Sequence, residues 1–221
     1  MLDQIVPPPV VAVETFGDPP DAQLHPDEDA LLRRAVAKRR TEAGAARWCA
    51  RQALAELGLP PAPILTGLRG APVWPAGVIG SMTHCAGYRA AALAHSRDIA
   101  TIGIDAEPHS PLPGGVAEMV ASQAERDALA ELAAAAPDVC WDKLLFSAKE
   151  ATYKAWFPMT QRWLGFQEAS IGINPADGTF TARLLVPGPV LAGHQLTEFS
   201  GRWLAASGLV ITSIAVPAGP A

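Results

Sequence analysis

The stretch 99–107 (IATIGIDAE) constrains the fold most, because apolar and acidic side chains alternate towards its end. Successive side chains of a β-strand point to opposite faces of the sheet, so Ile102, Ile104 and Ala106 should face a core while Asp105 and Glu107 share the other face. Two neighbouring carboxylates repel each other unless a cation lies between them, and Mg²⁺ prefers such hard oxygen ligands. The spacing is equally compatible with a strand end whose acids face water, because metal motifs this short have a high false-positive rate.

A further carboxylate lies in the segment 138–157, whose apolar stripe predicts a helix. Glu150 and Lys154 are four residues apart there and share one helical face. On a surface they would form an ion pair of little energetic value. The flanking residues are mostly aromatic or alanine, so we expect a buried helix in which both charges need partners. A third metal-ligating carboxylate with a lysine beside it would meet that need.

The chain has 221 residues and a net charge of −5, which weighs against a general nucleic-acid binder. The segment 33–51 departs from this balance, because it holds seven cationic side chains and a single acidic one. Arg40, Arg47 and Arg51 fall close to one helical face, and Arg69 follows in a loop. Such a run is usually a solvated surface, but a local basic face on an acidic body also suits a small polyanion.

The three cysteines are far apart and lack CxxC spacing, so we expect neither a disulfide framework nor a zinc site. No stretch approaches the roughly 18 apolar residues of a membrane span, and the first residues do not resemble a secretion signal. We therefore expect a cytoplasmic protein that binds neither membrane nor nucleic acid. The absence of phosphate-loop, GxGxxG, HExxH and GxSxG motifs weighs against kinases, dehydrogenases, zinc proteases and α/β-hydrolases.

Helix and strand patterns divide the chain into two halves, and we see no convincing repeat in the sequence itself. The proline- and glycine-rich stretch His109–Gly115 predicts a linker between an N-terminal lobe, 1–108, and a C-terminal lobe, 109–221. The expected class is α/β (α+β). The predicted helices are 27–58, with a break at Gly44, 122–136 and 138–157, the last one stopped by Pro158. The predicted strands are 10–15, 78–82, 89–94, 99–107, 170–174, 179–186, 202–207 and 210–216, with a loop over 60–77.

Four motifs in this order resemble those of the phosphopantetheinyl transferase family. They are RGAP at Arg69–Pro72, SMTHC at Ser81–Cys85, GIDAEP at Gly103–Pro108 and FSAKEATYKAW at Phe146–Trp156. Any one of them is only moderately specific, whereas the ordered set is highly specific and covers most of the chain. The likeness is closest to the single-chain, pseudo-dimeric (surfactin-synthetase-activating) type and, within it, to the actinobacterial PptT-like branch.

The resemblance implies two similar lobes related by a pseudo-two-fold axis, with the active site in the cleft between them. It implies Mg²⁺, with Mn²⁺ as the alternative, held by Asp105, Glu107, Glu150 and the main-chain carbonyl of Ala106. Coenzyme A would be the co-substrate. Its expected contacts, from the resemblance and from the basic helix, are Arg39, Arg40, Arg47, Arg51, Thr66, Gly67, Leu68, Arg69, Thr83, His84, Lys149 and Lys154.

The implied reaction transfers 4′-phosphopantetheine from coenzyme A to a serine of an apo carrier-protein domain of a polyketide, nonribosomal peptide or fatty-acid synthase. Glu150 is the expected general base, with Asp105 and Lys154 as the other catalytic groups. We expect a monomer that docks its carrier at Leu112–Met119. A coenzyme-A-dependent acyltransferase and a non-enzymatic module that binds a nucleotide or a carrier remain as alternatives.

Overall fold

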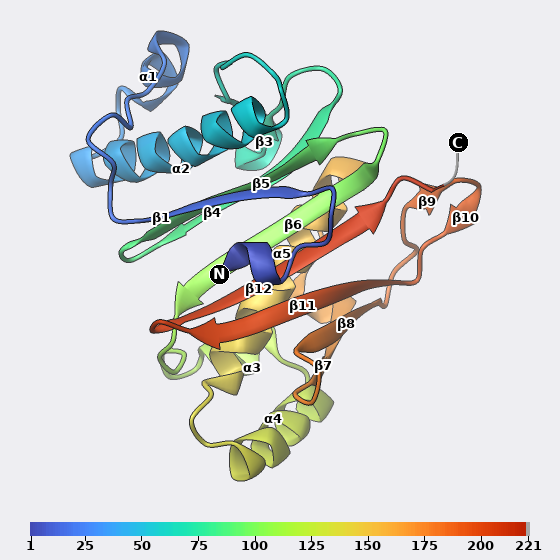
Figure 1. Cartoon of the computed structure of the whole chain (residues 1–221). Coiled ribbons are helices and arrows are strands. Elements are labelled where there is room, and N and C mark those ends of the chain that lie inside the picture. Colours follow the sequence, from blue (N-terminus) through green and yellow to red (C-terminus); the bar gives the residue numbers. More distant parts are fainter. Residues whose placement is uncertain (220–221) are drawn as a thin grey trace.

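The computed structural model describes residues 1–219 and contains two larger antiparallel sheets (Figure 1). The strands are β1 (Val11–Phe16), β2 (Leu65–Thr66), β3 (Pro72–Val73), β4 (Val78–Cys85), β5 (Tyr88–His95), β6 (Ile99–Pro108), β7 (Ala169–Asn174), β8 (Thr179–Leu184), β9 (Val190–Leu191), β10 (His194–Gln195), β11 (Glu198–Ala206) and β12 (Leu209–Pro217). One sheet has the order β1-β5-β4 and the other the order β6-β12-β11-β8-β7, while β2-β3 and β10-β9 form short pairs. The predicted mixed α/β class is confirmed.

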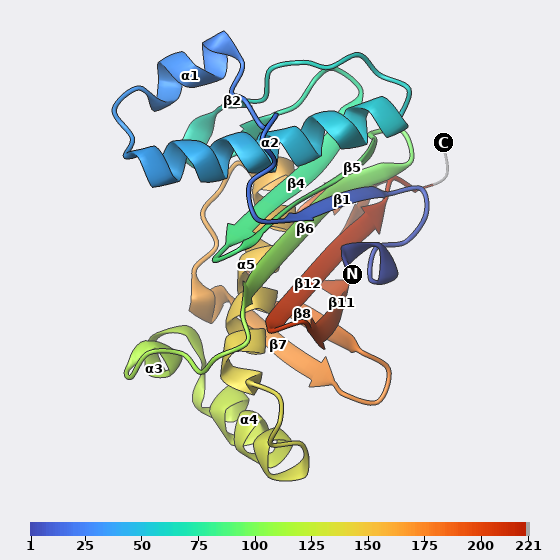
Figure 2. The same cartoon turned by 60° about the vertical axis from the view of Figure 1, so that its left-hand side comes forward.

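Two long helices each cover one of the larger sheets (Figure 2). The helices are α1 (Pro26–Leu32), α2 (Ala37–Glu56), α3 (Val116–Val120), α4 (Gln123–Ala135) and α5 (Trp141–Thr160). Helix α2 packs on β5 and β1, and α5 packs on β6 and β12. None of the helices in residues 1–219 combines the length and the apolar composition needed to cross a bilayer.

Strand β6 has the two faces that its alternating residues predicted. Ile102, Ile104 and Ala106 are buried in a core that also contains residues of β5 and β12. The opposite face lies under α5, where the Thr101 hydroxyl donates a hydrogen bond to the Ala155 carbonyl at 2.7 Å. Asp105 is on this second face and therefore points towards the helix that carries the other predicted catalytic groups.

Strands β4 and β6 meet through side chains rather than through a backbone ladder. The Ser81 hydroxyl accepts a hydrogen bond from the Ile104 N–H at 3.1 Å, and the Thr83 hydroxyl accepts one from the Ala106 N–H, also at 3.1 Å. These hydroxyls satisfy backbone donors that are buried at the edge of β6. The backbone of β6 pairs with β12, so the sheet groups residues 99–108 with the C-terminal half, whereas the predicted lobes place them in the N-terminal one.

Four local predictions need correction. The helix expected over 27–58 is two helices, and the break lies between α1 and α2 rather than at Gly44. Gly44 lies inside α2, and a Cβ there would lie 2.8 Å from the Ala22 carbonyl oxygen, so close packing rather than a break in the helix accounts for the glycine. Pro158 lies inside α5, which ends only before the left-handed Gln161. Two short strands, β2 and β3, also lie in the predicted loop 60–77, whereas the predicted linker, 109–115, is free of helix and strand.

The N-terminal half holds a buried glutamate in the first turn of α1. Glu28 is fully buried, accepts a hydrogen bond from the distant Ile64 N–H at 2.7 Å and pairs with Arg51 of α2 at 2.9 Å. It also accepts the N–H of His25, the residue that caps α1, at 2.8 Å. One carboxylate therefore joins α1, α2 and the segment before β2.

The C-terminal half repeats this arrangement in the first turn of α4. Glu125 is buried, accepts the N–H of the capping residue Ser122 at 2.7 Å and that of the distant Ile171 at 2.8 Å, and pairs with Lys149 of α5 at 3.0 Å. The glutamate is the third residue of its helix in both halves. The repeat supports the pseudo-two-fold relation that the resemblance implied. It was not visible as a repeat in the sequence itself, because it consists of contacts between distant segments.

Gly103 sets the distance between β6 and α5. A Cβ at this position would lie 2.0 Å from the Ala151 carbonyl oxygen and 2.7 Å from the Ala155 nitrogen. We expect Gly103→Ala to lower the free energy of unfolding by about 1–3 kcal/mol, the usual cost of overpacking. In a chain of this size Tm then falls by roughly 2–4 °C per kcal/mol, which differential scanning calorimetry would measure. Gly172→Ala is the matched control, because Gly172 is also in a strand and has open space at its Cβ position; equal Tm values for the two variants would contradict this account.

Candidate active site

A cavity of about 630 Å³ lies between the two halves. Helix α2, the loop 66–74 and strand β4 form the wall from the first half, and β6 and α5 form the wall from the second. The site residues predicted from the sequence that line it are Arg39, Arg47, Thr66, Gly67, Leu68, Arg69, Thr83, His84, Asp105, Glu150 and Lys154. The cavity therefore brings cations of one half to face acids of the other.

Asp105 and Lys154 form the central contact between β6 and α5. The Lys154 ammonium donates to Asp105 Oδ1 at 2.8 Å and to the Ile104 carbonyl oxygen at 3.0 Å. The Thr83 hydroxyl also lies 3.3 Å from Asp105 Oδ1. Asp105 Oδ2 is buried, and it has no hydrogen-bond partner among the described residues. A buried carboxylate oxygen without a partner is costly, so this atom is well placed to accept a ligand.

Glu107 and Glu150 lie close enough to Asp105 for the three charges to interact. Burial raises the pKa of Glu150, and the charges of Asp105 and Glu107 raise it further against the opposing effect of Lys154. Burial and the charge of Asp105 likewise raise the pKa of Glu107, whereas Lys143, whose ammonium lies 3.6 Å away, opposes the shift. A nearby cation would stabilise the ionised form of each of these acids and lower its pKa.

Arg47 reaches the cavity from α2 with its guanidinium held in place by the protein. Nε donates to the Ile64 carbonyl oxygen at 2.8 Å, one terminal nitrogen to the Thr66 hydroxyl at 3.0 Å and the other to the Ala43 carbonyl oxygen at 3.3 Å. A guanidinium has five N–H groups, so two remain for a ligand. They suit an anion such as a phosphate, which accepts paired hydrogen bonds from arginine.

His84 and Arg39 add polar groups to the same wall. His84 is half exposed, and its Nδ1 lies 3.9 Å from a Glu42 carboxylate oxygen. Burial lowers the pKa of His84, the cations Lys154, Arg89 and Arg39 lower it further, and Glu42 opposes the shift. A neutral imidazole still has one N–H donor, so His84 can hydrogen-bond an anionic ligand without being charged.

Arg69 and Trp163 meet from opposite halves beside the cavity. The guanidinium carbon of Arg69 lies 5.5 Å from the centre of the Trp163 ring, a cation–π contact. Trp163 also packs against Tyr153, with the ring centres 5.0 Å apart. The sequence analysis did not select Tyr153, although it lines the cavity and its buried hydroxyl has no partner within residues 1–219. Its position three residues after Glu150 was the available signal, because residues at that spacing share a helical face.

Arg40 and Arg51 were predicted to contact the ligand, but neither lines the cavity. Arg40 donates to Asp29 and to the Leu32 carbonyl oxygen, and Arg51 donates to Glu28 and to the Gln23 carbonyl oxygen. Helical periodicity predicted that these side chains lie near Arg47. Instead, the acids of α1 draw them away from the cavity.

Lys149 is also turned away from the cavity. Its ammonium is buried and donates to Glu125, to the Phe166 carbonyl oxygen at 2.7 Å and to the Ala169 carbonyl oxygen at 3.0 Å. A lysine has three N–H donors, so all of them are used within the protein. This geometry gives the predicted contact with coenzyme A no support.

The acids offer the right chemistry for a divalent cation, but they do not form a complete site by themselves. Within residues 1–219, no group of three or more His, Cys, Asp or Glu side chains is arranged to hold a metal ion. Ala106 and Glu107 do not line the cavity, and Lys143 and Lys154 lie beside two of the acids. The unpartnered Asp105 Oδ2 and the raised pKa values of Glu107 and Glu150 nevertheless fit a divalent cation, because its charge would stabilise all three carboxylates. Three carboxylates fit Mg²⁺ as ligands.

Two family models match the chain. The model described as 4′-phosphopantetheinyl transferase N-terminal domain matches residues 27–94, and the one described as 4′-phosphopantetheinyl transferase superfamily matches residues 101–206. The gap between the two matches falls between β5 and β6, where the two larger sheets also divide.

Three of the similar proteins come from Streptomyces, Nocardia and Mycobacterium. The chain is 55% identical to the 4′-phosphopantetheinyl transferase Svp of Streptomyces mobaraensis, over 100% of this chain and 92% of Svp. It is 50% identical to Npt of Nocardia iowensis, over 97% and 99% of the two chains, and 49% identical to PptT of Mycobacterium tuberculosis, over 91% and 89%. The chain therefore belongs to the 4′-phosphopantetheinyl transferase family, whose members transfer phosphopantetheine from coenzyme A to carrier proteins.

Proposed function

We propose that coenzyme A binds in the cavity between the two halves, with its pyrophosphate at Asp105, Glu150 and Lys154. One observation carries the proposal. These three side chains line the same cavity as the arginines of α2 and of the loop 66–74. The acceptor is an apo carrier-protein domain of a polyketide, nonribosomal peptide or fatty-acid synthase. Its serine oxygen bonds to the phosphorus next to pantetheine, the bond from that phosphorus to the bridging oxygen breaks, and adenosine 3′,5′-bisphosphate leaves.

The basic wall of the cavity binds the 3′-phosphate of coenzyme A. Arg47 offers two N–H groups in fixed positions, since the contacts to Ile64, Thr66 and Ala43 hold its guanidinium. Arg39 and His84 line the same wall and provide further donors. Charge-assisted hydrogen bonds of this kind are roughly twice as strong as neutral ones. Arg69, at the side of the cavity, extends the same positive region.

Asp105, Glu107 and Glu150 would hold the divalent cation, Mg²⁺ or Mn²⁺, together with the carbonyl of Ala106. The cation would neutralise charge that develops on the pyrophosphate during transfer. The support comes from the unpartnered Asp105 Oδ2 and from Glu107 and Glu150, whose pKa values are raised by burial and by the charge of Asp105. Thr83 and Lys154 both contact Asp105 and so orient its carboxylate.

Glu150 takes the proton of the carrier serine. Its raised pKa makes it a stronger base than an exposed glutamate, and it lines the cavity beside Lys154. The Lys154 ammonium has three donors and uses two on Asp105 and Ile104, so one remains to offset charge on the leaving group. The enzyme supplies no nucleophile of its own, because the serine belongs to the partner.

The carrier docks on the segment Leu112–Met119, and the enzyme works as a monomer. Met119 is exposed on the short helix α3, which follows β6 along the chain. The exposed Trp163, beside Tyr153, adds apolar surface near the cavity. An exposed apolar side chain of this size is a common anchor for a partner.

Replacing Glu150 tests the proposed base. Glu150→Gln keeps the size of the side chain but cannot accept the proton, so we expect kcat to fall by about 10²–10⁴ while coenzyme A still binds. Intact-mass spectrometry of an apo carrier domain, incubated with coenzyme A and Mg²⁺, would measure the gain of one phosphopantetheine group. Glu131→Gln makes the same chemical change on exposed α4 and is the control; a Glu150→Gln variant that kept the normal rate would exclude Glu150 as the base.

Arg47 is expected to set the affinity for coenzyme A. Arg47→Ala removes the two N–H groups that face the ligand, so KM for coenzyme A should rise by about tenfold or more, with a smaller change in kcat. Lys38→Ala removes one positive charge from the same helix at an exposed position and should leave KM near its normal value. Steady-state kinetics with varied coenzyme A separates the two variants, and an unchanged KM in Arg47→Ala would remove this residue from the site.

Chelation tests the proposed cation. Excess EDTA should stop the transfer and added Mg²⁺ or Mn²⁺ should restore it, because Asp105, Glu107 and Glu150 need a cation between them. Asp105→Asn should raise the Mg²⁺ concentration that gives half of the maximal rate. Transfer that continues at its normal rate in EDTA would count against the metal site.

A further inference from the structure

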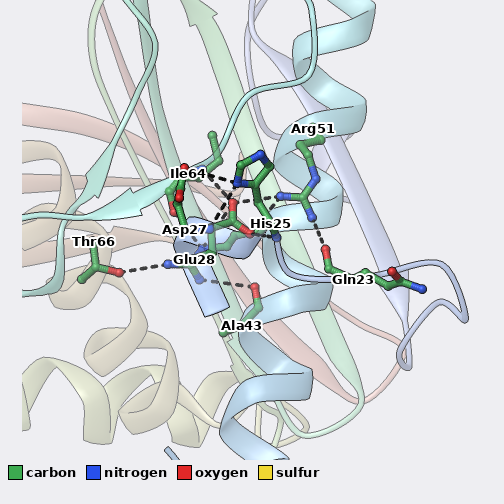
Figure 3. Close-up of polar contacts among 9 residues, drawn as sticks. Gln23, His25, Asp27, Glu28, Ala43, Arg51, Ile64 and Thr66 are labelled. Atoms are coloured by element: carbon green, nitrogen blue, oxygen red, sulfur yellow. Dashed lines mark hydrogen bonds and ion pairs between the residues drawn. The ribbon is translucent and has the colours of Figure 1, made fainter. Parts of the chain in front are cut away.

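Glu28 is a buried charge next to Arg47 of the proposed coenzyme A wall, and the mechanism does not use it. It is fully buried, and its carboxylate lies between Arg51, His25 and the backbone of Ile64 (Figure 3). Glu28 does not itself line the cavity. A buried carboxylate is costly unless several donors compensate it, and here two backbone N–H groups and one guanidinium do so.

Ile64 connects Glu28 to Arg47. The Ile64 N–H donates to Glu28 at 2.7 Å, and the carbonyl oxygen of the same residue accepts from Arg47 Nε at 2.8 Å. Arg47 then donates to the Thr66 hydroxyl at 3.0 Å, so the start of the loop 66–74 is tied to the same guanidinium. Glu28 thereby fixes the backbone that fixes the orientation of Arg47.

Glu28 also acts on Arg47 directly through charge. Its carboxylate oxygen lies 3.9 Å from Arg47 Nε. Burial lowers the pKa of Arg47 and the charge of Arg51 lowers it further, whereas Glu28 opposes both. Without Glu28, two arginines would face each other on adjacent turns of α2 with no acid between them. We then expect Arg47 to turn towards water and away from the cavity.

We propose that Glu28 is a positioning residue that sets the affinity for coenzyme A by holding Ile64 and the Arg47 guanidinium at the cavity wall. The inference rests on the proposed role of Arg47. It assigns a binding effect to a residue that touches neither the substrate nor the cavity.

The C-terminal half shows why the test must separate positioning from stability. Glu125 makes the equivalent contacts there, but its partner Lys149 uses all three of its N–H donors in hydrogen bonds within the protein. The same arrangement therefore acts as a purely structural connection in that half. Glu28 differs because the backbone that it holds also holds Arg47, a residue with two N–H groups left for a ligand.

The experiment is a double-mutant cycle of Glu28→Gln and Arg47→Ala, with Kd for coenzyme A measured by isothermal titration calorimetry and kcat by carrier modification. We expect Glu28→Gln to raise Kd by about tenfold and to change kcat much less. In the Arg47→Ala background the same change should add less than about threefold, because residues that act through one another are not additive.

Leu54→Ala controls for lost stability. Leu54 is fully buried on α2, away from the cavity lining, and its truncation removes core packing from the same half. We expect Leu54→Ala to lower Tm. At temperatures below this Tm, its Kd for coenzyme A should not rise. Should Glu28→Gln fail to fold, Glu28→Asp keeps the charge with a shorter reach and should raise Kd by about threefold.

The outcomes distinguish this inference from the proposed function. An unchanged Kd in Arg47→Ala would overturn the proposed role of Arg47 in binding and, with it, this inference. A raised Kd in Arg47→Ala with an unchanged Kd in the Glu28 variant would overturn only the role of Glu28. Independent, multiplicative effects of the two changes, or an equal rise of Kd in Leu54→Ala, would also overturn it.

Discussion

The close approach of α5 to β6 at Gly103 determines where the acids and the lysine of the cavity lie. Backbone atoms of Ala151 and Ala155 occupy the space that a side chain would need there. Lys154, which lies between these two alanines on α5, reaches both the Ile104 carbonyl and Asp105. A more distant helix would leave the lysine short of the strand. The catalytic arrangement thus depends on a residue that contributes no functional group.

The two walls of the cavity have opposite charge, and each is stabilised in a different way. On the basic side, the fully buried Glu28 compensates Arg51 and, at a longer distance, Arg47. On the acidic side, Lys154 and Lys143 compensate Asp105 and Glu107 only in part, since Asp105 Oδ2 lacks a partner in the described chain. Coenzyme A carries its 3′-phosphate and its pyrophosphate on the nucleotide half, so a cavity that binds this half needs cations for two separate anionic groups. This explains why an enzyme with a net negative charge concentrates its arginines on α2.

The sequence predicted the two faces of β6, the mixed α/β class and the set of motifs whose residues meet in the cavity. These features depend on local periodicity or on short patterns, which survive in a single sequence. It did not predict that Arg40, Arg51 and Lys149 turn away, because the acids that pair with them lie on other helices, α1 and α4. Lys149 shows this most clearly, as it pairs with Glu125, 24 positions before it. The sequence also did not predict the interruption between α1 and α2, because the helical periodicity of the apolar residues continues through it.

The repeated glutamate arrangement bears on how many substrate molecules one polypeptide can hold. Two equivalent halves would offer two equivalent sites across a two-fold axis. Here Arg47 stands four residues before Arg51, whereas the residue four positions before Lys149 is the apolar Leu145. The second half thus lacks the guanidinium that would receive a phosphate at the corresponding place. The expected stoichiometry is therefore one coenzyme A per chain.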